Sequence, residues 1–135
     1  MVTKNTKTSD ERTMMIITHI LGLFLGFIGP LIILLVAKDT ETKNHARKAL
    51  NWQITMAIIG IILFGVFFTI GMGSMLLTMV NPLFMIVYFV CFFLLWIPIM
   101  GLGIANLVFC IMAAIKAKDG ILWTYPFSIP LLKTE

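Results

Sequence analysis

Hydrophobic positions along this chain fall into two long blocks separated by a short polar stretch. The first block covers residues 13–37, and His19 is its one ionisable residue. The second covers residues 49–115 and contains no Asp, Glu, Lys, Arg or His. A soluble domain cannot bury so long a charge-free run, whereas a membrane-spanning helix needs about 20 apolar residues. The pattern therefore predicts an all-α integral membrane protein, folded as a helical bundle.

The first block predicts one helix with a break near its middle. Residues 9–12, Ser-Asp-Glu-Arg, suit a helix start because Ser and Asp cap well and acidic groups favour this end. The pair Gly29-Pro30 predicts the break, since proline lacks a backbone donor and clashes with the preceding turn. A straight helix and a re-entrant segment remain as alternatives. Gly22, Gly26 and Gly29 give this segment a small-residue face, and we expect another helix to pack there.

The second block is too long for a single span. Asn81-Pro82 is its strongest turn signal and divides it into a helix over 49–80 and a helix over 83–116, kinked near Pro98. The alternative is three shorter spans, with breaks near Gly73 and Pro98. Basic residues favour the first division, because the loop 38–48 and the tail 117–135 then share the cytoplasmic side. With the first block this gives three transmembrane helices, four being the alternative, behind a polar tail at residues 1–12.

This topology predicts where individual positions lie. Thr42 and Asp119 are expected on the cytoplasmic side and Asn81 on the opposite side. Residues 44–53 are expected to form a short interfacial helix that runs into the next span.

Aromatic and polar side chains near the ends and middles of the spans carry further expectations. Trp52, Trp123 and Tyr125 are expected at the level of the lipid headgroups, where amphipathic rings anchor membrane proteins. Asn106 lies within a span, so its amide is expected to bond to another helix as a packing contact. His19 is expected just below the headgroups, hydrogen-bonded to backbone or water.

Composition agrees with a membrane protein and argues against nucleic-acid binding, catalysis and metal binding. The chain is 60% hydrophobic and 12% charged, with a mean hydropathy of +1.04. Its net charge of +4 comes from three separate polar islands and forms no basic face for nucleic acid. No catalytic motif is visible, and Cys91 and Cys110 have no metal-ligand spacing. We therefore expect no enzymatic activity, cofactor, metal site or nucleic-acid partner.

Short motifs in order along the chain carry a family resemblance. They are Thr18–Gly22, Gly29-Pro30, Lys38-Asp39, His45–Gln53, Ala113–Ala117 and Gly120–Pro126. On these motifs, from about Glu11 to Leu132, the chain resembles a family of small bacterial membrane proteins that is similar to the chloroplast inner-envelope protein-import subunit of the TIC channel family. Residues 72–93 depart from that pattern by being longer than in the usual bacterial member. The resemblance implies a multi-pass protein of the bacterial cytoplasmic membrane.

Three functions are compatible with these observations. The leading one is a non-enzymatic accessory or assembly subunit, whose partners are the lipid bilayer and other membrane proteins or further copies of itself. The second, implied by the resemblance, is a homo-oligomeric translocation or channel component. The third is an immunity or envelope-stress protein against a membrane-active peptide.

Overall fold

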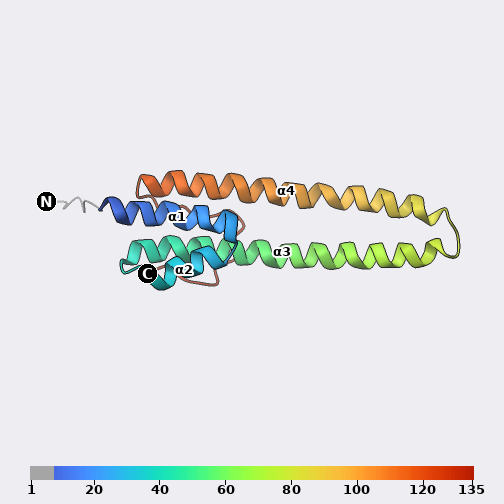
Figure 1. Ribbon diagram of the computed structural model, residues 1–135, viewed down its shortest axis with the longest axis horizontal. Coiled ribbons are helices and arrows are strands. Elements are labelled where there is room, and N and C mark those ends of the chain that lie inside the picture. The colour runs from blue at the N-terminus through green and yellow to red at the C-terminus, as the bar shows by residue number, and fades with distance from the viewer. Residues whose placement is uncertain (1–7) are drawn as a thin grey trace. The chain divides into compact units, whose positions relative to one another are not determined.

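The computed structural model describes residues 8–135, and this part of the chain is entirely helical outside its turns and tail. Its four helices are α1 (Ser9–Leu25), α2 (Ile28–Val36), α3 (Thr40–Thr78) and α4 (Phe84–Lys118), shown in Figure 1. Of the polar tail expected at 1–12, residues 1–7 lie outside the described part. Residues 9–12 already belong to α1, whose cap is Thr8: its hydroxyl accepts from the Glu11 N–H while the Glu11 carboxylate accepts from the Thr8 N–H.

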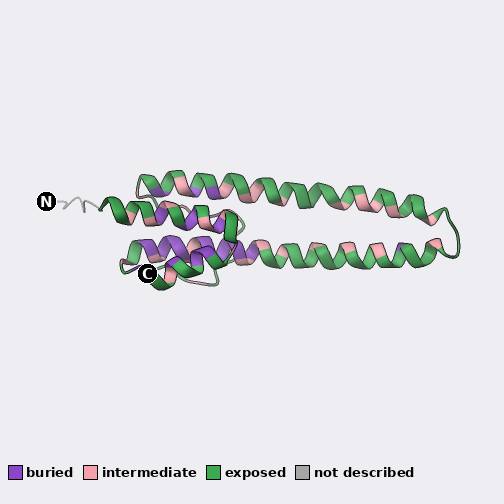
Figure 2. Ribbon diagram, viewed as in Figure 1, coloured by how far each residue is buried: buried purple, intermediate pink, exposed green. Residues whose placement is uncertain are grey.

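The chain divides into two compact units. The polar-core unit contains the described residues up to Thr55 together with Asn106–Glu135, and the apolar unit contains Met56–Ala105. Figure 2 shows buried positions along the first part of α3 and predominantly exposed ones along its second part. Each unit is described below by itself.

Within the polar-core unit, the first apolar block folds as a helix, a turn and a second helix. The break lies at Gly26, where φ is 59°, and not at Gly29-Pro30. Gly26 closes α1 because glycine adopts positive φ without steric cost. Pro30 lies in the first turn of α2, where a backbone N–H would have no acceptor within the helix, so the N–H that proline lacks costs no hydrogen bond. α2 packs back against α1: a Cβ on Gly29 would lie 2.6 Å from the backbone carbon of Leu21.

The second block forms two helices with one turn between them. α3 begins within the expected polar loop, where the Asp39 carboxylate accepts a 2.6 Å hydrogen bond from the Thr42 N–H. Residues 44–53 are thus part of a long helix. α3 ends at Thr78, α4 begins at Phe84, and Asn81-Pro82 forms the turn. Neither helix is interrupted at the alternative break positions: α3 continues through Gly73 and α4 through Pro98.

Two helices of the described chain, α3 and α4, are long and apolar enough to cross a membrane. The break at Gly26 divides the first block into α1 with 17 residues and α2 with 9, so the four helices are compatible with the expected bundle of three to four. In the apolar unit most large apolar side chains are exposed, among them Ile61, Phe64, Phe93 and Ile97. An aqueous surface does not carry such a face, whereas lipid-facing helices do.

A tail follows α4. The N–H of Ile121 donates to the Lys116 carbonyl and the N–H of Gly120 to the Ala117 carbonyl, with Gly120 at φ 72°. These bonds form a Schellman motif that ends the helix. The tail then reverses direction at Pro126-Phe127, where Phe127 has φ 64° and is 89% exposed.

Candidate functional site: a buried polar core

Side chains of α3 hold the tail by its backbone. The amide of Asn51 donates to the Leu132 carbonyl and accepts from the Leu132 N–H, both at 2.9 Å. Asn44 makes the same two-way contact with the backbone of Glu135. Side chains on one face of α3 therefore donate to and accept from the backbone of the extended tail, as the backbone of a neighbouring strand would.

The spacing of these contacts explains why the tail fits. Seven helical residues from 44 to 51 rise about 10 Å, and three extended residues from 132 to 135 also span about 10 Å. A further contact, 2.9 Å from the Ile129 N–H to the Thr55 hydroxyl, continues the ladder in the antiparallel sense. At the other end Arg47 forms a 2.7 Å ion pair with Glu135.

Three side chains, linked in a row by hydrogen bonds, join the tail to α1 and α3. The Tyr125 hydroxyl lies 2.8 Å from Nδ1 of His19, and Nε2 of His19 lies 3.0 Å from Nδ1 of His45. All three residues are at most 2% exposed. His19 and His45 are thus core residues, and the backbone or water partner expected for His19 is replaced by these two side chains.

Burial shifts the pKa of two of these three side chains, His19 and Tyr125. It lowers the pKa of His19 well below its usual range, and the neighbouring His45 adds to this effect. Burial also raises the pKa of the Tyr125 hydroxyl, with Cys110 contributing. Neither residue belongs to α3 or α4, the two helices able to span. A neutral imidazole carries one N–H, so His19 accepts at one nitrogen and donates at the other. His19 is therefore held neutral between the Tyr125 hydroxyl and His45.

Asn106 is the centre of a second group of hydrogen bonds. Its Oδ1 accepts from Trp52 Nε1 at 2.9 Å and from Gln53 Nε2 at 3.1 Å, which ties α4 to α3. The thiol of Cys110 lies 3.5 Å from the same oxygen. The structure thus gives the Asn106 amide the cross-helix partners that its position in a span requires.

The three aromatic residues expected as headgroup anchors pack against one another. Trp52 and Tyr125 are 3% and 2% exposed, and their rings stack at 5.3 Å with an interplanar angle of 8°. Trp123 meets Tyr125 edge-on at 5.0 Å. Trp52 Nε1 and the Tyr125 hydroxyl also have protein partners, Asn106 and His19. The expected level of the three rings at the lipid headgroups stays a prediction.

The glycines of the first block have different environments. A Cβ on Gly22 would lie 3.3 Å from Pro30 and 3.4 Å from Gln53 of α3, so this position allows close approach. Gly29 contacts Leu21 within the α1–α2 pair. Gly26 has no atom within 4 Å of its Cβ position, so within this chain it serves as a turn residue.

Sequence reasoning missed the contact of the tail with α3 and the pairing of the two histidines. Asn44, Asn51 and Thr55 share one helical face, a signal that was available. The pairing of His19 with His45 had no local signal, because the two lie on different helices. Across residues 8–135, no group of three His, Cys, Asp or Glu side chains could hold a metal ion.

The fold and this core define a class: a small helical protein with two helices able to span a membrane and a tail locked by buried polar side chains. The model of the magnetosome magnetite crystal formation protein family matches residues 10–132. The chain belongs to that family.

Two other comparisons return nothing: no curated protein and no solved structure matches the chain. A small bacterial family is therefore supported, whereas the relation to the chloroplast import subunit receives no support from any comparison.

Proposed function

We propose that this chain is a non-enzymatic, multi-pass protein of a bacterial membrane that acts as an accessory or assembly subunit through helix contacts. The observation that carries the proposal is the uncovered face of the apolar unit. Its large side chains are exposed, and a Cβ at Gly60, Gly65, Gly73 or Gly101 would meet nothing within 4 Å. Small residues of this kind let a second helix approach closely.

The polar-core unit supports the same function. Buried polar side chains of this unit, among them His19, Asn51 and Gln53, bond to other side chains or to the tail, which suits a structural role. The family description, magnetite crystal formation in magnetosomes, points to a compartment membrane as the place of action. We propose that the chain contributes to assembling proteins in such a membrane.

Helix contacts can be tested with variants that leave the chain's own packing alone. Gly65→Leu and Gly101→Leu add bulk where the chain has open space, so the isolated protein should keep its thermal stability. A partner helix packed there would be displaced, and recovery of the complex in mild detergent should fall. Ile61→Leu, at a position 71% exposed, is the matched control. A monomer that retains no partner and does not self-associate would refute the proposal.

The multi-pass arrangement can be tested by labelling single cysteines with an impermeant reagent in intact cells, with Cys91 and Cys110 replaced. Thr42 is fully buried, so the neighbouring exposed Glu41 is the better reporter site. Two crossings by α3 and α4 place Glu41 and Asp119 on one side and Asn81 on the other. Labelling should reach position 81 only. Labelling of positions 41 and 119 from opposite sides would contradict it.

A further inference from the structure

Three helices each carry a charged residue that borders their apolar run, and these three residues lie toward the same end of the polar-core unit. α1 and α3 begin at this end and α4 finishes there, as Figure 1 shows for this unit. The nearest charged residues are Arg12, Lys48 and Lys116, each directly before or after an apolar run. A common boundary of this kind marks the level of lipid headgroups.

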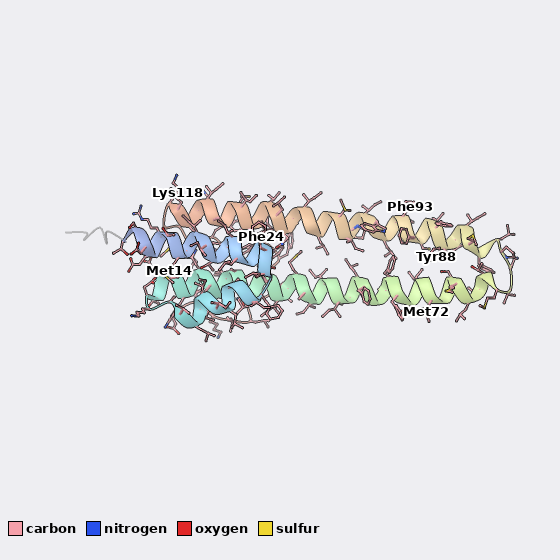
Figure 3. All side chains as sticks on the ribbon, in the orientation of Figure 1. Met14, Phe24, Met72, Tyr88, Phe93 and Lys118 are labelled. Carbon is pink, nitrogen blue, oxygen red and sulfur yellow. The ribbon has the colours of Figure 1, made fainter. Side chains whose placement is uncertain are left out.

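A groove between α1 and α4 opens at this boundary. Its volume is about 280 Å³, and aliphatic side chains line it, including Ile16, Ile20 and Leu23 from α1 and Ile115 from α4. Lys118 lines its charged end, and Figure 3 shows this side chain at the end of α4. Arg12 precedes Ile16 by one helical turn on the same face of α1. The groove is therefore apolar along its length, with Lys118 in its lining and Arg12 one helical turn beyond Ile16 on the same face of α1.

We propose that this groove binds one acyl chain of an anionic phospholipid, with the lipid phosphate at Lys118 and Arg12. The apolar length matches hydrocarbon, and the basic mouth complements a negative headgroup. Asp119 follows Lys118 but lies in the turn beyond the helix and does not line the groove. Glu11 is held in the cap of α1 by the Thr8 N–H.

The test uses the full chain in mild detergent and counts bound lipid by native mass spectrometry. Phosphatidylglycerol should be retained more than phosphatidylcholine with the same acyl chains. Lys118→Gln should lower retention of phosphatidylglycerol by about fivefold, the effect of one basic residue near an anionic surface. Lys116→Gln is the matched control: it removes the same charge from the same helical turn at a position outside the groove, and retention should change little.

A second pair of variants tests the acyl part. Ile20→Trp fills the groove and should reduce retention of both lipids, whereas Ile17→Trp, on α1 at a similarly exposed position outside the groove, should not. Equal losses for Lys116→Gln and Lys118→Gln would overturn the proposal, since they would show a general charge effect. Equal retention of the two lipids would overturn it as well. So would competition by inorganic phosphate at the same concentration, because the site would then bind the phosphate alone.

Discussion

The polar-core unit and the apolar unit are built on the same two long helices but are held together differently. In the apolar unit the contacts are between rings, such as Phe67 with Phe92 at 5.5 Å and Tyr88 with Phe92 at 6.1 Å. In the polar-core unit ring contacts are accompanied by hydrogen bonds between side chains and from side chain to backbone. The difference arises because the polar-core unit contains a turn and an extended tail, whereas the apolar unit consists mainly of helix. A helix forms the hydrogen bonds of its own backbone N–H and C=O groups, whereas a turn or an extended tail in apolar surroundings needs hydrogen-bond partners from other parts of the chain.

The tail shows this requirement most clearly. Asn44, Asn51 and Thr55 supply hydrogen-bond partners to tail residues that no strand accompanies. Tyr125 then fixes the tail to α1 through His19. Removing a member of either group should affect the polar-core unit and leave the apolar unit intact.

The largest expected effect comes from the tightest backbone contact. Gly29→Ala would place a Cβ 2.6 Å from backbone and side-chain atoms of Leu21, which cannot shift cheaply. The free energy of unfolding should fall by about 3 kcal/mol, the upper range for overpacking. Gly60→Ala is the matched control, because it meets nothing within 4 Å and should be neutral or slightly stabilising. Unfolding in mixed micelles measures both, and equal stability of the two variants would refute the contact.

Loss of the tail ladder should have the next largest effect. Asn51→Ala removes two hydrogen bonds to Leu132 and should cost about 2 kcal/mol, at about 1 kcal/mol for each bond. Limited proteolysis should then cut the tail faster than in the parent chain. Thr69→Val is a suitable control, since that hydroxyl bonds only to its own helix at Gly65. Unchanged proteolysis of the tail in Asn51→Ala would contradict the ladder.

Acidification should destabilise the polar-core unit. The pKa of His19 is lowered in the folded chain, so the unfolded chain binds a proton first as the pH falls below about 6.5. Stability is therefore full above that pH and declines progressively below it. Thermal unfolding between pH 7.5 and 4.5 measures this slope, and His19→Gln should flatten it. A parent chain equally stable over this range would count against a neutral buried His19.

The smallest effect is a gain. Phe127 has a positive φ at the tail's reversal and is largely exposed, so its backbone strain is not offset by burial. Phe127→Gly should raise the free energy of unfolding by about 1 kcal/mol in detergent. Phe127→Ala is the matched control, because it removes the ring but keeps a Cβ at the positive φ. It should give no comparable gain, and an equal gain would show that the ring and not the backbone is responsible.

The sequence predicted the parts of the fold that depend on local signals. The helices of the charge-free run and the Asn81-Pro82 turn between them follow from composition and turn chemistry, and both lie where expected. The break in the first block was displaced to Gly26 because glycine with positive φ ends a helix more readily than Pro30 in a first turn. The polar core could not be predicted, since His19, Tyr125 and their partners lie far apart in sequence. Trp52 and Tyr125 were assigned to the headgroup level on side-chain preference, which does not predict that their rings stack on each other.

One measurement tests most directly whether buried polar bonds hold the tail to α1. A double-mutant cycle with His19→Ala and Tyr125→Phe gives the coupling free energy between the two side chains. We predict a coupling of at least about 1 kcal/mol, because each single variant leaves a buried polar group without its partner. Tyr88→Phe in the apolar unit, combined with His19→Ala, should give a coupling near zero. Additive effects of His19→Ala and Tyr125→Phe would contradict the polar core described for this protein.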